Sequence, residues 1–404
     1  MGAPRPGALI LIVVIIVVIL AGIQLLRPTP SATLQSALPA SYKIPGTPPS
    51  MPWPTQGEAT VEVNGVGSFG SSGGETPEPI ASVAKMMTAL VVLTDHPLTL
   101  GQQGPTIHIT PADVALEQTE AAQQDSVVAV APGETLTEYQ ALQALLIPSG
   151  NNIAMVLADW DAGSEAAFVA KMNAKAKALG MVHTHYADVS GISGSTVSTA
   201  TDQLILTKVV MANPVFAHIV GEAQVTLPVA GVQENYDYNL GKDGFVGTKT
   251  GSDSTALGCF AFTSDHQIDG HRYQIMGVVL GQPATISDPS ELQVALDDAT
   301  ALVNAVVAHM TLLDPVPTGT TVAHIDAAWS SPIPVTTKST TAILGWPGMP
   351  LATRLDAKLP SQAVPAGTVV GTLEVRAGKQ AASIPVTTSA PFSTPSLGWK
   401  LTRL

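Results

Sequence analysis

The sequence predicts a mixed α/β protein: an antiparallel sheet flanked by helices, followed by a small all-β domain and preceded by an apolar N-terminal helix. Three observations lead to this prediction. Residues 8–26 are almost entirely apolar, helical and strand-like patterns both occur over residues 57–312, and helical periodicity disappears over residues 313–404. A length of 404 residues also exceeds what one ordinary domain needs.

The apolar run ALILIVVIIVVILAGIQLL (8–26) is 19 residues long. About 17–25 such residues cross the hydrocarbon core of a bilayer. A signal peptide has a shorter apolar stretch and a small-x-small cleavage site, whereas this run ends in Leu-Leu-Arg-Pro. We therefore expect residues 1–27 to be a membrane-anchoring transmembrane helix, with a cleaved signal peptide as the alternative.

Residues 28–56 contain eight prolines separated by Ser, Thr and small residues. Proline fixes φ and lacks an N–H donor, which excludes a helix or a central strand. We expect a semi-extended spacer between the anchor and the folded part.

Residues 57–312 combine helical and strand patterns. The turn dipeptide Asn64-Gly65 predicts a hairpin over 59–70, and the residues over 80–94 are apolar around most of a helix, which indicates a central position. Thr135 and Glu138 form a possible capping box for the next helix. Further helices are expected at 151–160, 165–179, 201–211 and 290–310, and antiparallel strands at 245–249, 257–263 and 273–280.

The last part, residues 313–404, is rich in Thr, Val, Ser and Pro with short alternating runs such as TVVGTLEV (368–375). Turn signals recur between these runs, so a separate all-β domain is expected. Residues 390–404 hold two prolines and no apolar helical stripe, and we expect no amphipathic membrane helix there.

Composition excludes several classes of function. A net charge of −13 and 4% aromatic residues argue against nucleic-acid binding, which needs a basic face or stacking rings. The single cysteine, Cys259, excludes an internal disulfide and a thiolate-rich metal site. His183 and His185 lack the spacing of a helical zinc pair, so no metal site is expected.

Three short polar clusters interrupt apolar elements. In Ser82-Val83-Ala84-Lys85, positions three apart share one helix face, so hydroxyl and amine can meet. A lysine in an enclosed helix favours its neutral form, and a neutral lysine beside a serine is a base beside a nucleophile.

The second cluster, Ser149-Gly150-Asn151, breaks two apolar helices, and the third, Lys249-Thr250-Gly251, ends a predicted strand. A strand edge with a lysine and a hydroxyl suits an extended peptide that ends in a carboxylate, and glycine allows close approach. Alone, the first cluster is also typical of a surface helix with an incidental Ser and Lys. The second is typical of a plain turn that caps the next helix, and the third of an exposed strand end.

Together, S-x-x-K, S-x-N and K-T-G in this order, 67 and 100 residues apart, resemble the active-site set of penicillin-binding proteins and serine β-lactamases. Residues 57–308 resemble the low-molecular-mass penicillin-binding proteins of the D-alanyl-D-alanine carboxypeptidase family. The resemblance extends to the segments PIASVAKMMTALVVL (79–93), LLIPSGNNIAMVLA (145–158), YADVSGI (186–192) and GFVGTKTG (244–251). It implies a β-lactamase/transpeptidase-like fold and no cofactor.

The resemblance implies the following roles. Ser82 attacks the D-Ala-D-Ala bond of a peptidoglycan stem peptide and forms an acyl-enzyme, and a β-lactam imitates the dipeptide and traps Ser82. Lys85 is the general base, Ser149 relays a proton to the leaving amine, and Asn151 holds the substrate backbone and the Lys85 amine.

The third cluster would hold the other end of the substrate. By resemblance, Lys249, Thr250 and Gly251 bind around the terminal carboxylate, and the backbone N–H groups of Ser82 and Ser252 form the oxyanion hole. Relatives often add an arginine in the following strand. Arg272 stands nearest but early in register, and its role stays open.

Alternatives remain on the same fold and beyond it. A class A β-lactamase needs a Glu-x-x-x-Asn loop, and none of Glu165, Glu222 and Glu234 has Asn four residues on. A DD-endopeptidase uses the same chemistry, and a non-catalytic penicillin-binding sensor is the alternative from another class. A peptidoglycan enzyme works outside the cell, so we expect a cytoplasmic N-terminus and an extracytoplasmic catalytic domain, secreted if residues 1–27 are cleaved.

Overall fold

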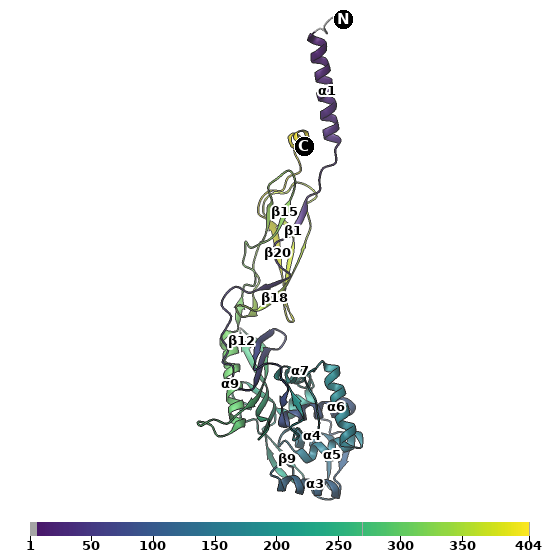
Figure 1. Cartoon of the computed structure of the whole chain (residues 1–404), viewed down its shortest axis with the longest axis vertical. Helices are drawn as coiled ribbons and strands as arrows, with labels where there is room; N and C mark the ends of the chain where they lie inside the picture. Colours follow the sequence, from purple (N-terminus) through teal and green to yellow (C-terminus); the bar gives the residue numbers. More distant parts are fainter. Residues whose placement is uncertain (1–5, 269, 404) are drawn as a thin grey trace. The chain divides into compact units, whose positions relative to one another are not determined.

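The computed structural model describes residues 6–268 and 270–403. It divides into two compact units, one with residues up to Pro48 together with Leu312 onward, the other with Pro49–Thr311. Figure 1 shows the elements of both units.

The Pro49–Thr311 unit is built on a five-stranded antiparallel sheet in the order β11-β12-β13-β3-β4. The predicted hairpin around Asn64-Gly65 is confirmed, since it joins β3 to β4. Helix α9 packs on β12 and β13, and α7 packs on β13 and β3 (Figure 1). The five strands are β3 (Glu58–Val63), β4 (Gly67–Ser72), β11 (Phe245–Asp253), β12 (Leu257–Ile268) and β13 (His271–Gln282).

The remaining elements of this unit form a largely helical part. The predicted helix over 80–94 is confirmed, with its first turn as the 3-10 helix η1 and nearly every following residue buried. The helices are η1 (Ala81–Ala84), α2 (Lys85–Asp95), α3 (Pro111–Ala122), α4 (Glu138–Leu146), α5 (Asn151–Ala162), α6 (Glu165–Leu179), α7 (Ala200–Met211), α8 (Pro214–Val220) and α9 (Glu291–His309). Short strands are β5 (Glu78–Pro79), β6 (Thr106–His108), β7 (Thr135–Thr137), β8 (Val197–Ser198), β9 (Gln224–Leu227) and β10 (Gly231–Glu234).

The capping box predicted at Thr135 and Glu138 was wrong by two residues. Thr135 lies in β7, and the box is made by Thr137 and Gln140, whose side chains bond each other's backbone N–H groups at 3.1 and 3.0 Å. Glu138 is instead fully buried, and burial raises its pKa to about 7.

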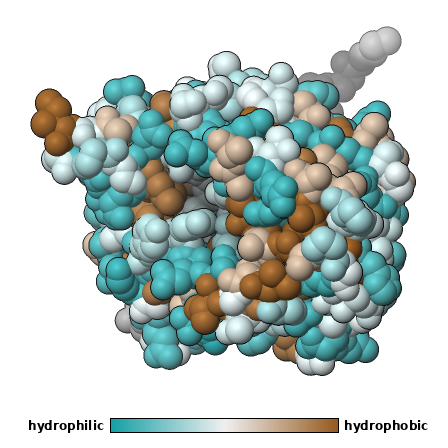
Figure 2. Space-filling model, turned by 90° about the horizontal axis from the view of Figure 1, so that it is seen from below, coloured by the Kyte–Doolittle hydropathy of each residue, from teal (hydrophilic) through white to brown (hydrophobic). Residues whose placement is uncertain are grey.

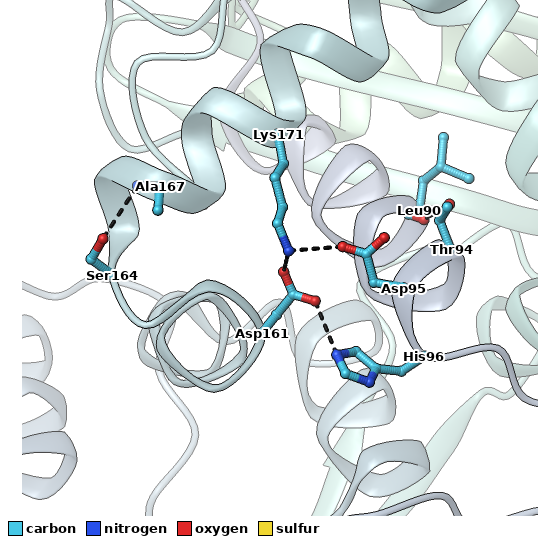
Figure 3. A network of polar contacts seen from close by, with 8 residues as sticks. All are labelled: Leu90, Thr94, Asp95, His96, Asp161, Ser164, Ala167 and Lys171. Carbon is cyan, nitrogen blue, oxygen red and sulfur yellow. Dashed lines mark hydrogen bonds and ion pairs between the residues drawn. The ribbon is translucent and has the colours of Figure 1, made fainter.

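A charged network fixes the C-terminal end of α2 (Figure 3). The buried Asp161 of α5 accepts hydrogen bonds from Lys171 of α6 at 2.6 Å and pairs with the His96 ring at 3.0 Å. Lys171 also donates to Asp95, the last residue of α2, at 2.8 Å. Because α2 carries the first polar cluster at its other end, this network helps to fix the helix that presents Ser82 and Lys85.

The other unit contains an antiparallel seven-stranded sheet in the order β1-β15-β16-β20-β19-β18-β2. The expected all-β region after residue 313 is therefore present. Its strands are β1 (Thr33–Ser36), β2 (Ser41–Lys43), β15 (Thr321–Asp326), β16 (Ile333–Thr337), β18 (Pro350–Ala357), β19 (Val369–Ala377) and β20 (Gln380–Thr388), with β14 (Thr311–Leu313) and β17 (Ile343–Gly345) outside this sheet.

The structure differs from the expected spacer over 28–56. Residues 33–36 and 41–43 form the two edge strands of this sheet, pairing with β15 and β18, and residues from Pro49 onward belong to the other unit. The prolines flank these strands rather than interrupt them. Edge strands tolerate such neighbours, so these two strands are compatible with the proline content of the segment.

The apolar N-terminal run forms α1 (Pro6–Leu26), a helix long and apolar enough to cross a membrane. Residues 390–404, where no amphipathic membrane helix was expected, contain the six-residue helix α10 (Leu397–Thr402), which Ser396 caps just after the two prolines. The Arg403 guanidinium donates to the carbonyl oxygens of Gln24 and Pro28 at 3.1 Å each.

Candidate active site

Ser82 lies in a backbone turn held tightly from the side. The preceding residue, Ala81, has a φ of 43°, a conformation that a non-glycine residue rarely adopts. A Cβ on Gly191 would stand 1.8 Å from the Ala81 carbonyl oxygen, so only glycine fits there. The loop carrying Gly191 thus packs directly on the turn that presents Ser82.

Lys85 follows Ser82 by one turn and is fully buried. Its Nζ donates to Ser82 Oγ at 2.7 Å, to Asn151 Oδ1 at 2.6 Å and to the Ser190 carbonyl oxygen at 3.0 Å. The first two polar clusters of the sequence therefore meet at one amine. All three partners are neutral, and no carboxylate in the described part of the chain forms an ion pair with Lys85.

Burial lowers the pKa of Lys85 well below its ordinary value, and the positive charge of Lys249 adds to this effect. More distant carboxylates, Asp188 first among them, oppose it. A lysine whose charged form is disfavoured in this way can act as a base.

Asp188 organises the loop beside Lys85. One of its oxygens, Oδ2, accepts the backbone N–H groups of Ser190, Gly191 and Ile192 at 3.1, 2.8 and 3.0 Å and the Ser190 hydroxyl at 2.9 Å. This fan of hydrogen bonds fixes the turn that aims the Ser190 carbonyl oxygen at Lys85. Sequence reasoning missed both residues, although an Asp two residues before Ser-Gly is a turn signal.

The second cluster lies where α4 ends and α5 begins. Ser149 has a φ of 64°, and its Oγ is buried without a hydrogen-bond partner among residues 6–268 and 270–403. Behind it, a Cβ on Gly150 would stand 2.9 Å from Val128 Cγ2 and 3.1 Å from a backbone oxygen of α4. The break thus turns the Ser149 hydroxyl toward the cleft and Asn151 toward Lys85.

The third cluster lies on β11, the edge strand of the five-stranded sheet nearest η1. A Cβ on Gly251 would stand 2.9 Å from Ser82 N and 3.0 Å from Val83 N, so the strand passes directly against the nucleophile's backbone. Lys249 is 2% exposed and donates to the Thr250 carbonyl oxygen at 3.0 Å. Burial lowers its pKa to about 7, and the negative charge of Asp237 counteracts this.

All three clusters contribute to one cleft of about 300 Å³. Its lining residues are Ser82, Ser126, Ser149, Tyr236, Tyr238, Thr250, Gly251, Ser252, Ser290 and Leu292. In the view from below, the molecular surface is hollowed near its centre, with hydrophilic and hydrophobic residues mixed around the rim (Figure 2). A larger hollow of about 540 Å³ beside His96 and Glu138 contains none of the three clusters, so size alone does not locate the chemistry.

Arg272 does not reach this cleft. Its side chain is 73% exposed and pairs with Asp265. On β13, Arg272 pairs with Gln267 of β12. Lys249 of β11 pairs with Ala261 of β12, and Ala261 pairs with Val278, which lies further along β13 than Arg272. The sequence register indicated that Arg272 lies too early in its strand for a carboxylate-binding arginine, and the structure agrees with this.

Comparison with known proteins supplies the family. The sequence model described as D-alanyl-D-alanine carboxypeptidase matches residues 71–284, more than half of the chain. The chain belongs to the D-alanyl-D-alanine carboxypeptidase family of serine peptidases. Its structure is similar to the Streptomyces K15 DD-transpeptidase, with a TM-score of 0.55 and 25% identity over 65% of this chain and 100% of that one.

Two curated members of this family match at 38% identity. The D-alanyl-D-alanine carboxypeptidase DacB2 of Mycobacterium tuberculosis aligns over 45% of this chain, and a D-alanyl-D-alanine endopeptidase of Pseudomonas aeruginosa over 33%. The chain spans 60% and 39% of their lengths. The carboxypeptidase DacD of Francisella tularensis shares the fold at 19% identity, with a TM-score of 0.59 over 86% of this chain.

Proposed function

We propose that this family member removes the terminal D-alanine from peptidoglycan stem peptides through an acyl-enzyme on Ser82. The observation that carries the proposal is the 2.7 Å contact between Ser82 Oγ and the fully buried Nζ of Lys85. A buried amine with neutral partners is a base, and a hydroxyl in contact with it is an activated nucleophile.

In acylation, neutral Lys85 takes the Ser82 proton as Oγ attacks the carbonyl carbon between the two D-alanines. The oxyanion that forms accepts hydrogen bonds from the backbone N–H groups of Ser82 and Ser252. Ser149, whose hydroxyl has no hydrogen-bond partner among the described residues, relays this proton from Lys85 to the leaving amine, and D-alanine departs. Asn151 keeps the Lys85 amine in place throughout.

Substrate binding uses the open edge of β11. A peptide that adds as a further strand would place its terminal carboxylate near Lys249 and Thr250, with Gly251 allowing close backbone approach. Water then hydrolyses the Ser82 ester. A β-lactam imitates the same dipeptide and is expected to acylate Ser82, but without the Glu-x-x-x-Asn loop its hydrolysis is expected to be slow.

The apolar helix α1 supports action at the cell surface. We propose that α1 anchors the chain in the membrane with the N-terminus inside and both folded units outside, where peptidoglycan is found. Removal of residues 1–27 as a signal peptide would give a secreted protein instead. N-terminal sequencing of the membrane fraction distinguishes the two.

A second candidate is a DD-endopeptidase, which one relative's name favours. The reaction is the same, with a crosslinked peptide as the leaving group. If the protein is a carboxypeptidase, as we propose, D-alanine release from a synthetic pentapeptide should be faster than cleavage of a D,D-crosslinked dimer. The opposite ratio would favour the endopeptidase.

The intact mass of the protein after incubation with benzylpenicillin tests the nucleophile. The parent should gain one penicilloyl adduct that persists for hours, and Ser82→Ala should gain none. Loss of the adduct within seconds would indicate a β-lactamase, and no adduct on the parent would refute the proposal. A protein that forms the adduct but releases no D-alanine from a pentapeptide would be a penicillin-binding sensor.

A further inference from the structure

The loop between β10 and β11 is fastened at two points on either side of an inward-facing carboxylate. Asn235 donates to two carbonyl oxygens at the end of α8, at 3.3 and 3.1 Å. Four residues later, Asn239 donates to Leu296 and Thr300 of α9 at 2.9 and 3.0 Å. The segment 235–239 is therefore held on both sides by helices.

Side chains alternate along this segment. Tyr236 and Tyr238 point outward, are 39% and 50% exposed, and line the cleft beside Thr250. Asp237 between them is 4% exposed. The loop thus places an acidic side chain directly behind the wall that the two tyrosines form.

The Asp237 carboxylate is only half satisfied. Its Oδ1 accepts the Asn239 backbone N–H at 3.1 Å, and its Oδ2 is buried without a hydrogen-bond partner in the described chain. A buried carboxylate oxygen without a hydrogen-bond partner is not compensated for the hydration it has lost.

Among charged side chains, Lys249 has the largest electrostatic effect on the Asp237 carboxylate. Asp237 in turn is the charged side chain that acts on the Lys249 ammonium. Burial raises the pKa of Asp237 to about 6 and lowers that of Lys249 to about 7, while each side chain counteracts the shift of the other. The nearby cations are Lys242, whose exposed amine is bound to the Tyr238 carbonyl oxygen at 2.7 Å, and Lys85, whose pKa Lys249 helps to lower.

We propose that Asp237 is a positioning residue that keeps the Lys249 ammonium charged behind the tyrosine wall, so that the cleft recognises a substrate carboxylate at neutral pH. This inference rests on the proposed function, because it concerns the carboxylate of that substrate. It also links the two lysines of the site: a charged Lys249 discourages protonation of Lys85, so Asp237 supports binding and base chemistry together.

The variant Asp237→Asn tests this in the full chain in detergent micelles. The amide keeps the shape and the bond to Asn239 but removes the negative charge, so the pKa of Lys249 should fall by about one unit. At pH 8 acylation by benzylpenicillin should then be about tenfold slower than in the parent. At pH 5 the two should agree, because Asp237 is protonated in the parent and Lys249 is charged in both.

Asp243→Asn is the matched control. Asp243 is exposed, lies in the same loop, has a φ of 45° that asparagine also adopts, and does not act on Lys249. It should leave the rate ratio at unity at every pH. A merely structural role of Asp237 would instead lower the rate equally at pH 5 and pH 8, and that outcome would overturn the proposal.

A second measurement does not depend on activity. In protein labelled with ¹³C at lysine Cε, the Lys249 resonance, assigned with Lys249→Arg, should titrate at lower pH in Asp237→Asn than in the parent. An unchanged titration refutes the role of Asp237 even if D-alanine is released. A shifted titration without D-alanine release supports that role and refutes the proposed function.

Discussion

Two lysine-centred clusters lie at opposite ends of helix α2. At its N-terminal end, Lys85 is fully buried and contacts a hydroxyl, an amide oxygen and a carbonyl oxygen. At its C-terminal end, Lys171 is 41% exposed and bridges the carboxylates of Asp95 and Asp161 at 2.8 and 2.6 Å (Figure 3). The two amines have similar numbers of oxygen partners in very different electrostatic surroundings.

The pKa values move in opposite directions as a result. Burial lowers the pKa of Lys85. Hydrogen bonds to Asp161 and Asp95 raise the pKa of Lys171. A lysine with carboxylate partners stays charged and holds helices together. A lysine denied such partners becomes a base. The difference lies in the partners and in solvent access, not in the residue type.

Exchange of each lysine for methionine is expected to show the largest contrast. Lys85→Met removes the general base, and acylation by benzylpenicillin should fall about 10³-fold, within the usual range for such catalysis. Lys171→Met should change the rate less than about twofold, because only a structural contact is lost. Stopped-flow acylation measures both. Equal losses would refute the assignment of base chemistry to Lys85 alone.

Giving Lys85 a carboxylate partner should make it resemble Lys171. In Asn151→Asp a negative charge replaces the amide oxygen now 2.6 Å from Nζ, and the pKa of Lys85 should rise by about 1–3 units. Protonated Lys85 cannot accept the Ser82 proton, so acylation at pH 7 should be about 10–100-fold slower than in the parent.

The deficit of Asn151→Asp should shrink as the pH rises, since the neutral amine returns above its raised pKa. Asn151→Ser, which adds no charge, serves as the control and should show a deficit that is the same at all pH values. A pH-independent deficit in Asn151→Asp would mean that Asn151 acts through shape alone.

The sequence predicted the contact between the catalytic residues better than the contacts that hold these residues in place. Ser82 and Lys85 were expected to meet because residues three apart share a helix face, and they lie 2.7 Å apart. The Ser190 carbonyl oxygen could not be predicted in the same way. It reaches Lys85 only through the turn that Asp188 organises, a contact across 105 residues that no periodicity encodes.

The same difference between local and long-range contacts is found in the fold. The hairpin at Asn64-Gly65 and the buried helix after Ile80 follow from local chemistry, and both were predicted. The edge strand over 33–36 was not, because its partner β15 lies almost 300 residues away. Asp237 was missed for a related reason. Its importance arises from a buried lysine on another element, and the sequence around it resembles an ordinary polar loop.

The smallest expected effect tests the structural end of α2. Asp161 is fully buried, and in Asp161→Asn the neutral amide can accept only one of its two bonds, from Lys171 or His96. The free energy of unfolding of this unit should fall by about 2 kcal/mol, as for a lost hydrogen bond to a charged group. Its calorimetric transition should drop by about 4–8 °C.

Asp95→Asn is the matched control for Asp161→Asn, because the Asp95 side chain is 37% exposed and water can replace its bond to Lys171. It should cost less than about 1 kcal/mol. Both variants should acylate at the parent's rate at temperatures where they are folded. If Asp161→Asn slowed acylation without lowering the transition, the C-terminal end of α2 would act on Ser82 through the helix, and the two clusters could no longer be treated as independent.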